Sequence, residues 1–293
     1  MHWAIIVNPH SGKRRALVLG HEVRELATAK NIEVTWISGA SAIESANSLR
    51  ASIASNTIDA VVVVGGDGLV NLAVQELAGT SIPMGVLAAG TGNDFARSSK
   101  TFGLTPAALV DLMTSQNPVA IDAGRVSVAG KERWFVQVLS TGFDSMVNER
   151  ANRFSGLKGK MKYNIATALE LPRFRPKSYS ITADGREITT KAMLVAIANG
   201  ATYGGGMQIC PNADRHDGLF DVLVLHPVPI LEFIRVFPKV FKGTHVTHPK
   251  VEIFRARSIS ITADAVAYAD GERYGDLPVK ADSIPQALYT WVC

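Results

Sequence analysis

The sequence of 293 residues is poor in cysteine and contains no long apolar run. Cys210 and Cys293 alone cannot form the disulfide framework of a small secreted domain, so they favour a reducing compartment. No segment has the roughly 20 apolar residues that span a bilayer. The formal charge of +4 is too small to indicate a nucleic-acid partner. These absences favour a cytoplasmic globular protein that binds no nucleic acid.

Three common motifs are missing as well. The sequence contains no Walker loop (G-x-x-x-x-G-K-[ST]), no dinucleotide fingerprint (G-x-G-x-x-G) and no nucleophile elbow (G-x-S-x-G). P-loop nucleotide sites, Rossmann dinucleotide sites and α/β-hydrolase chemistry are therefore excluded on motif grounds.

The first 124 residues alternate between strand and helix patterns. Strands are predicted at residues 4–7, 32–38, 59–64 and 82–87, and helices follow at 16–30, from Ser41 onwards and at 69–78. The uncharged start of the sequence is typical of a first strand rather than of a signal peptide. Strands that alternate with helices pair in parallel through right-handed crossovers, so this part is predicted to be an α/β domain.

The pattern changes near residue 124. Strands with alternating apolar and polar residues are predicted at 125–128, 133–139, 179–183, 192–199, 218–225, 251–254 and 258–263. This pattern indicates an antiparallel β-sandwich, interrupted by helices at 159–171 and 229–242. We therefore expect two domains, 1–124 and 125–293, with the extreme C-terminus packing back on the first.

Glycine-rich loops follow three of the predicted parallel strands. They begin near Asn8, Gly65 and Gly90. Loops at the carboxyl ends of parallel strands form a ligand crevice, and their backbone N–H groups and following helix N-termini suit anions. The second and third loops are separated by one strand–helix unit, so we expect them to lie side by side.

These loops resemble those of a known family. Residues 61–68, Val-Val-Val-Val-Gly-Gly-Asp-Gly, resemble the nucleotide loop of the diacylglycerol kinase-like lipid kinases, a family that includes sphingosine and ceramide kinases and bacterial relatives. Five further blocks match in order: Asn8-Pro9-x-Ser11-Gly12, Gly90-Thr91-Gly92-Asn93-Asp94-Phe95-Ala96-Arg97, Gly204-Gly205-Gly206-Met207 with Pro211, Ala213 and Asp217-Gly218, Lys242-Gly243-x-His245, and Asp270-Gly271-Glu272. The resemblance implies an N-terminal α/β lobe similar to phosphofructokinase and NAD kinase, a C-terminal β-sandwich lobe, and a ligand cleft between them.

The resemblance also implies the site residues. ATP is expected to contact Asn8, Pro9, Ser11, Gly12, Ser38, Gly65, Gly66, Asp67, Gly68, Asn71, Gly90, Thr91, Gly92 and Asn93. Magnesium near the phosphates is expected at Asp67, Asp94 and Asp122. A second, structural magnesium is expected at the Asp217 carboxylate and the backbone carbonyls near Asp214 and Leu219. The sequence departs from the family at Leu69, where threonine is usual, and at His216, where aspartate is usual. Leu69 removes a hydroxyl group that could bond a phosphate, which would weaken ATP binding or change the nucleotide pose.

Phosphoryl transfer also needs a base for the attacking hydroxyl. Asp270 and Glu272 are two residues apart, so they share a face if the segment is extended. We expect Glu272 to be the general base, assisted by Asp270. His245 and His248 lack a third ligand at suitable spacing, so a zinc site is not expected there.

The family points to a lipid substrate, most simply diacylglycerol, met at a membrane surface. Residues 229–242 combine apolar positions at helical spacing with Arg235, Lys239 and Lys242. Such a helix either packs on the sandwich or lies on an anionic membrane, and we expect a cytoplasmic protein that is peripheral at the inner membrane face and forms a homodimer. Two alternatives stay open: a small-molecule kinase similar to NAD kinase or phosphofructokinase, and a non-catalytic lipid- or nucleotide-binding protein.

Overall fold

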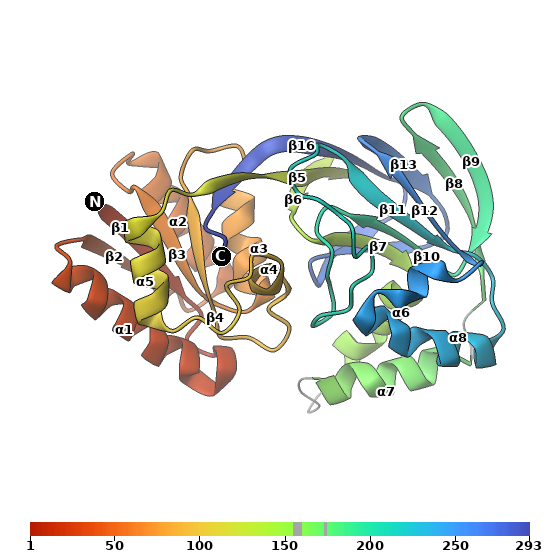
Figure 1. Cartoon of the computed structure of the whole chain (residues 1–293), viewed down its shortest axis with the longest axis horizontal. Coiled ribbons are helices and arrows are strands. Elements are labelled where there is room, and N and C mark those ends of the chain that lie inside the picture. The colour runs from red at the N-terminus through yellow and green to blue at the C-terminus, as the bar shows by residue number, and fades with distance from the viewer. Residues whose placement is uncertain (155–159, 173–174) are drawn as a thin grey trace. The chain divides into compact units, whose positions relative to one another are not determined.

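The fold is known from a computed structural model that describes residues 1–154, 160–172 and 175–293. The chain forms two compact units, Met1–Ala123 with Pro285–Cys293, and Gly124–Ile284. Figure 1 shows the elements of both. The division at residues 123 and 124 lies one residue before the expected boundary, and the last nine residues belong to the first unit.

A parallel sheet forms the centre of the first unit, as predicted. Its strands are β1 (His2–Val7), β2 (Glu33–Ile37), β3 (Ala60–Gly65) and β4 (Met84–Ala88), in the order β2-β1-β3-β4. They are parallel throughout, and the end of β16 (Val279–Thr290) adds Thr290 beside Met84. The chain reverses its winding direction between β1 and β3, which is where open α/β sheets bind ligands.

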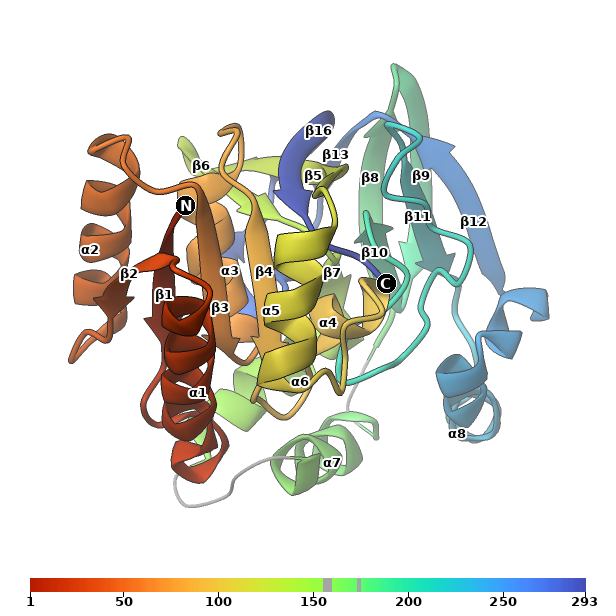
Figure 2. The ribbon, with the colours of Figure 1, turned by 60° about the vertical axis from the view of Figure 1, so that its left-hand side comes forward.

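Helices cover this sheet. They are α1 (Arg15–Ala29), α2 (Ala42–Ala54), α3 (Asp67–Leu77), α4 (Asp94–Ser98) and α5 (Pro106–Ser115). Strand residues such as Ile5 and Val62 pack with Val23 of α1 and Leu109 of α5 in one apolar core, and Figure 2 shows α1 and α5 on the same face of the sheet. Ser41, where a helix is predicted to start, caps α2: its hydroxyl accepts the Glu44 N–H at 3.2 Å, and the Glu44 carboxylate accepts the Ala40 N–H at 2.8 Å.

The second unit contains antiparallel sheets, as predicted. One sheet has the order β12-β11-β10-β7-β14-β15, with bounds Val251–Ala256, Phe220–Leu225, Leu194–Ala198, Val138–Gly142, Val266–Ala269 and Glu272–Asp276. The other sheet has the order β16-β13-β8-β9, with bounds Ser258–Thr262 for β13, Lys177–Ala183 for β8 and Arg186–Ala192 for β9. On its other side β16 pairs with β5 (Val119–Val128), and β5 pairs in turn with β6 (Lys131–Phe135). Side chains from both sheets, including Ile181, Val195, Val222 and Ile259, form a common core, so the unit is a β-sandwich.

Helical elements of the second unit are α6 (Phe143–Arg153), α7 (Lys160–Glu170), α8 (Ile230–Val236), η2 (Phe237–Lys242) and η3 (Thr244–Thr247); η1 (Ser11–Arg14) belongs to the first. The predicted helix 159–171 corresponds to α7, except that Gly159 lies outside the described residues. The predicted helix 229–242 divides into α8 and the 3-10 helix η2 near Pro238, because proline removes a helical N–H. No helix in the described ranges has the length and apolar character needed to cross a membrane.

One predicted strand is wrong. Residues 133–139 were expected to form a single strand, but β6 ends at Phe135 and β7 begins at Val138. The N–H groups of Val136, Gln137 and Val138 donate to the Asp270 carboxylate instead of to a neighbouring strand. A contact 132 to 134 residues away therefore breaks the strand, and local periodicity cannot reveal it.

Candidate functional site

Three loops meet at the carboxyl edge of the parallel sheet, as the sequence predicts. The loops after β3 and β4 are in backbone contact, because a Cβ atom on Gly90 would lie 2.4 Å from the Cα atom of Gly66. The Ala89 N–H donates to the Gly65 carbonyl at 2.8 Å. The loop after β1 joins them, since the Ser11 hydroxyl donates to the Ala89 carbonyl at 3.1 Å. We call this group of loops, residues 8–12, 65–68 and 90–93, the glycine-loop site.

Asp67 ties two of these loops together. It is the first residue of α3, and its Oδ2 and Oδ1 atoms accept the N–H groups of Asn93 and Asp94, each at 2.7 Å. These N–H groups belong to the start of α4, where a helix lacks internal acceptors and a carboxylate is stabilising. Asp67 therefore shapes the glycine-loop site before any ligand binds.

Asn93 fixes the loop after β4. It is buried and has a positive φ of 55°, a conformation that asparagine tolerates better than most residues. Its side chain accepts the Gly90 N–H and donates to the Gly90 carbonyl, both at 2.9 Å. The loop is thus held by protein contacts in one conformation.

The departure at Leu69 has a structural consequence. Leu69 is buried and packs over Gly65, where a Cβ atom would lie 2.8 Å from Cδ2 of the leucine. The side chain at this position thus covers the end of β3.

Other expected nucleotide residues lie at the same edge or in the following helix. Ser38 is exposed directly after β2, and Asn8 is exposed directly after β1. Asn71 is buried in the second turn of α3. Pro9, Gly12, Gly68 and Thr91 belong to the three loops or to the helix starts beside them.

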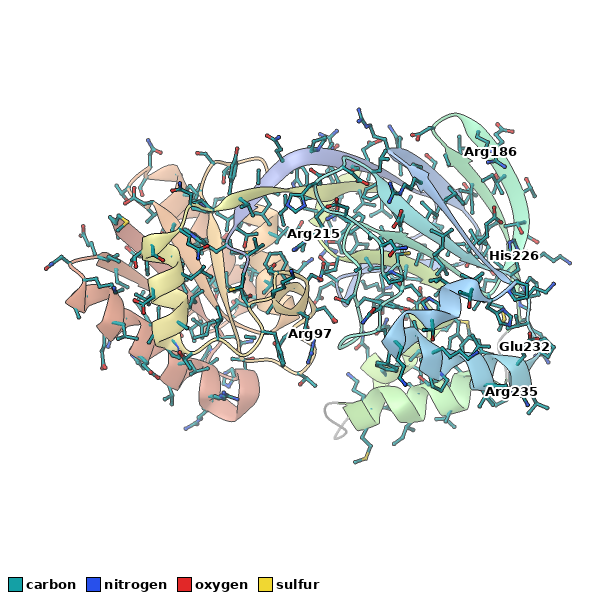
Figure 3. The ribbon with its side chains drawn as sticks, in the orientation of Figure 1. Arg97, Arg186, Arg215, His226, Glu232 and Arg235 are labelled. Carbon is teal, nitrogen blue, oxygen red and sulfur yellow. The ribbon has the colours of Figure 1, made fainter. Side chains whose placement is uncertain are left out.

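Arg97, the last residue of the block that begins at Gly90, contacts the glycine-loop site. Its Nε donates to the Gly92 carbonyl at 3.1 Å, and its guanidinium lies 3.8 Å from the ring centre of Phe102 (Figure 3). A half-buried cation bound to the loop carbonyl suits a phosphate ligand. In the sequence, a basic residue soon after a glycine-rich loop was the signal that could have identified Arg97.

Two carboxylates could hold magnesium, that of Asp67 in the glycine-loop site and that of Asp94 directly after it. Oδ2 of Asp67 and Oδ2 of Asp94 lie 2.5 and 3.3 Å from the place that a Cβ atom would take on Gly92. Mg²⁺ is usually bound by one or two carboxylates together with water and substrate phosphates, so this pair fits the ion. Asp122 is buried in β5, and its Oδ1 accepts the Gln286 N–H at 2.9 Å. Across the described ranges, no three His, Cys, Asp or Glu side chains gather into a metal-binding group, so Asp122 does not complete a triad with this pair.

The Asp270–Glu272 segment of the second unit is a hairpin turn and not an extended strand. It joins β14 to β15, where Ala269 pairs with Glu272. Asp270 and Gly271 have φ values of 50° and 85°, the left-handed pair that an Asp-Gly turn adopts. The premise that the two carboxylates share a strand face is therefore not met.

The two carboxylates of this turn have different surroundings. That of Asp270 accepts the N–H groups of Val136, Gln137 and Val138 at 2.8 to 3.2 Å. Glu272 is exposed, and its carboxylate makes no hydrogen bond or ion pair with any residue that the structure describes. Asp270 thus anchors the turn, and Glu272 keeps its lone pairs available.

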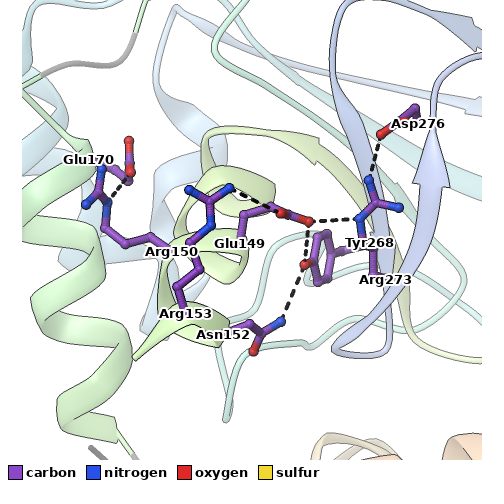
Figure 4. Close-up of polar contacts among 8 residues, drawn as sticks. All are labelled: Glu149, Arg150, Asn152, Arg153, Glu170, Tyr268, Arg273 and Asp276. Atoms are coloured by element: carbon purple, nitrogen blue, oxygen red, sulfur yellow. Dashed lines mark hydrogen bonds and ion pairs between the residues drawn. The ribbon is translucent and has the colours of Figure 1, made fainter. Parts of the chain in front are cut away.

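A pocket of about 370 Å³ lies in the second unit beside α6. Glu149 stands at its wall and receives hydrogen bonds from Tyr268 and Arg273, at 2.8 and 2.9 Å, and Arg273 also pairs with Asp276 at 2.7 Å (Figure 4). Burial, together with the Glu149 contact, raises the pKa of Tyr268 to about 12. The wall is therefore a charge-balanced network rather than an anion site.

At the start of α6, burial raises the pKa of Asp144 to about 6. Its Oδ1 accepts the Ser145 N–H at 2.9 Å, while its Oδ2 is buried and has no hydrogen-bond partner among the residues that the structure describes. Tyr179 lies nearby and is almost fully buried, and its hydroxyl has no hydrogen-bond partner within the described ranges either. The charged form of Asp144 is consequently costly in the folded protein.

The loop with Asp214, Asp217 and Leu219 is in contact with a cation from β12, Arg255. Oδ1 of Asp217 accepts the Leu219 N–H at 3.0 Å, and its Oδ2 lies 3.4 Å from the Arg255 guanidinium. Arg255 also pairs with the buried Asp221 at 3.0 Å. Asp214 is engaged by His216, through its N–H at 3.1 Å and its ring nitrogen at 2.9 Å. Arg255 thus already balances the charge of the Asp217 carboxylate, which disfavours a magnesium ion on that carboxylate. The expected backbone carbonyl ligands near Asp214 and Leu219 stay a prediction.

The two histidines of the later loop contact different partners. His245 is buried and its Nε2 lies 3.1 Å from the Ile209 carbonyl, whereas Nε2 of His248 lies 2.9 Å from Glu232. Burial lowers the pKa of His245. Both serve as loop contacts.

Comparison with known proteins covers nearly the whole chain. A family model described as the diacylglycerol kinase catalytic domain matches residues 2–126, and one described as the YegS C-terminal NAD kinase beta sandwich-like domain matches residues 137–292. A diacylglycerol kinase of Mycobacterium tuberculosis strain H37Rv is 40% identical over 289 residues, which cover 97% of this chain and 92% of that protein. A diacylglycerol kinase of Bacillus subtilis strain 168 is 27% identical over 228 residues, covering 75% and 73%. A crystal structure of a putative diacylglycerol kinase from Bacillus anthracis has a TM-score of 0.80 at 20% identity and covers 100% of this chain and 95% of that one. The predicted fold class is confirmed.

Proposed function

Because the chain belongs to the diacylglycerol kinase-like family of lipid kinases, we propose that it phosphorylates a lipid hydroxyl group with ATP. The bond between the γ-phosphorus and its bridging oxygen breaks, and ADP leaves. A new bond forms between that phosphorus and the lipid oxygen, and the hydroxyl proton passes to a protein base. Diacylglycerol is the proposed acceptor, since the relatives from M. tuberculosis and B. subtilis are named for it.

The observation that carries this proposal is the contact between the three glycine loops. At the ends of β3 and β4, the backbones at Gly66 and Gly90 lie so close together that no side chain fits between them. Phosphate groups bind where backbone N–H groups and helix N-termini point toward an open edge. Arg97, held on the Gly92 carbonyl, adds a fixed positive charge at this edge.

Asp67 and Asp94 would hold the magnesium ion, because their carboxylates flank Gly92. The ion offsets the charge of the phosphate oxygens when it is bound. Asp67 also keeps Asn93 and Asp94 in place through its two hydrogen bonds. It would therefore bind the ion itself and orient Asp94, the second candidate ligand.

Glu272 is the proposed base. Its carboxylate is exposed and unpaired among the described residues, so it can accept a proton. Asp270 positions it by holding the turn on the three N–H groups of residues 136–138. The roles expected for the two carboxylates therefore differ: Glu272 acts on the hydroxyl proton, and Asp270 supports it.

The test is transfer of label from γ-labelled ATP to a lipid extract, with the products identified by mass spectrometry. The wild-type protein should label lipid, and Glu272→Gln should lower the rate by about 10²–10⁴-fold with unchanged nucleotide affinity and melting temperature. Glu187→Gln, at an exposed position of β9, is the matched control and should keep full activity. Label on a water-soluble acceptor instead would favour the small-molecule kinase. Lipid and ATP binding without transfer would favour a non-catalytic protein.

A further inference from the structure

Helix α8 and the following η2 turn are apolar on two sides. Their inner side is anchored in the protein: Phe233 is buried and packs edge-to-face on Phe143 of α6 at 5.1 Å and against Phe237 at 5.5 Å. Val240 is buried as well. The predicted packing of this helix on the second unit is therefore present, but it uses only part of the apolar surface.

The outer side exposes large apolar side chains. Leu231 is 80% exposed, Ile234 52% and Phe241 49%. Eleven large apolar residues are exposed in the described part of the chain, and four of them fall between residues 230 and 241. Exposed apolar side chains that are scattered singly need no explanation, but a cluster marks an interaction surface.

The same segment also carries positive charge. Arg235, Lys239 and Lys242 are exposed and form no ion pair with the described residues. The one acidic residue of the segment, Glu232, lies 2.9 Å from His248, which leaves the three cations unbalanced. Figure 3 shows Arg235 at the outer edge of its unit.

We propose that this outer surface, made of Leu231, Ile234, Phe241, Arg235, Lys239 and Lys242, docks the protein on a bilayer that contains anionic phospholipid. Apolar side chains enter the boundary between headgroups and acyl chains, and the flanking basic side chains meet the negative lipid headgroups. A protein partner would need a surface whose acidic and apolar groups match these side chains one by one. A bilayer with anionic lipid offers negative headgroups and an apolar interior everywhere along its surface. The choice of a bilayer rests on the proposed function, but binding itself does not require catalysis.

A neighbouring helix supports the assignment. Ala166 and Leu171, in and just after α7, share an apolar core cluster with Val147 of α6 and Phe233 of α8. α7 exposes Met161, at 62%. Both views show α7 and α8 on the same side of the sandwich, away from the tip of the β8–β9 hairpin (Figures 1 and 2). α7 and α8 thus pack on one core cluster and lie in the same helical layer.

The experiment measures co-sedimentation of the full-length protein with vesicles of phosphatidylcholine alone or mixed with phosphatidylglycerol. Wild-type protein should bind the mixed vesicles and release at high salt. The double variant Leu231→Ser, Ile234→Ser should weaken binding to the mixed vesicles by about tenfold or more. Arg235→Gln, Lys239→Gln and Lys242→Gln should each weaken it about fivefold, because a basic residue near an anionic surface contributes about that factor.

Two control variants match these changes. Ile43→Ser removes an aliphatic side chain that is 75% exposed in the first unit, and Arg186→Gln removes an exposed cation on β9. Both should bind vesicles as the wild type does. Equal loss of binding in the controls, or unchanged binding by the α8 variants, would overturn the proposal. A lipid-independent dimer that Leu231→Ser with Ile234→Ser converts to a monomer would assign the surface to a second copy instead.

Kinase assays separate this proposal from the proposed function. The α8 variants should phosphorylate short-chain diacylglycerol dispersed in solution at the wild-type rate. They should phosphorylate diacylglycerol in mixed vesicles more slowly than the wild type does. Vesicle binding that depends on α8, in a protein that phosphorylates no lipid, would refute the kinase proposal and leave the docking surface in place.

Discussion

Replacing Gly90 by alanine tests the contact on which the glycine-loop site depends. The added Cβ atom would lie 2.4 Å from Cα of Gly66 and 2.9 Å from Oδ1 of Asn93. Carbon atoms that are not bonded pack at about 3.5–4.0 Å, so the loops after β3 and β4 must separate by about 1 Å. Gly90 does not have a positive φ, and the change therefore acts through this collision and not through backbone strain.

The expected loss is larger for nucleotide binding than for folding. Overpacking of this kind costs about 1–3 kcal/mol of stability, while a displacement of about 1 Å at a site can lower its performance about 100-fold. We expect the dissociation constant for a non-hydrolysable ATP analogue to rise by about 10- to 100-fold, which corresponds to about 1.4–2.7 kcal/mol. Isothermal titration calorimetry measures the affinity, and thermal unfolding of the same samples measures the stability.

Gly185→Ala provides the matched control. Gly185 has a φ of 85° and an open space around its Cβ position, at the turn between β8 and β9. Alanine there should cost about 1 kcal/mol of stability through backbone strain and leave nucleotide affinity unchanged. If Gly90→Ala binds the analogue as tightly as the wild type, the loop contact is not part of the nucleotide site.

Three further outcomes are expected. Asp270→Ala should lower the free energy of unfolding by about 3 kcal/mol or more, measured by urea denaturation, because three backbone N–H groups lose their acceptor; a loss below 1 kcal/mol would contradict the anchoring role. Asp144→Asn should stabilise the protein by about 2–3 kcal/mol above pH 7 and by little near pH 4, because burial raises the pKa of Asp144 from 3.8 to about 6 and the wild type loses stability as pH rises through that window; a difference that is constant from pH 4 to 8 would refute this cause. Without nucleotide, Mg²⁺ should leave the melting temperature of the wild type unchanged and raise that of Arg255→Gln, because the guanidinium already pairs with Asp217; an equal rise in both proteins would show that Arg255 does not exclude the ion.

The glycine-loop site could be predicted because parallel strands impose it. Once β3 and β4 are parallel neighbours, the loops after Gly65 and Ala88 must leave the sheet at one edge. The sequence did not show how the loops are held, since Asp67 reaches 26 and 27 residues along the chain to Asn93 and Asp94. Strand alternation reports which face is buried, and it carries no information about a carboxylate that bonds to a distant backbone.

The second unit was harder to predict for the same reason. The strand expected at 133–139 has suitable residues throughout, but Asp270 withdraws the N–H groups at its middle. The Asp-Gly pair at 270–271 is itself a hairpin signal between two short strand patterns, and it would have placed Asp270 in a turn. The helix α6 was missed because its mostly polar residues have only a narrow buried stripe, with Val147 and Ala151 facing the core.

The acidic residues of the matched motifs fall into two groups, and this division decides which variants are informative. Asp67 and Asp270 accept backbone N–H groups from segments far along the chain, so truncating either removes structure together with any chemistry. Glu272 contacts no described side chain or backbone donor through its carboxylate, so Glu272→Gln removes a base and leaves the turn intact. A loss of transfer in the Asp67 or Asp270 variant alone would therefore not identify a base. Only the combination of an inactive Glu272→Gln protein with unchanged stability and unchanged nucleotide affinity assigns proton removal to that residue.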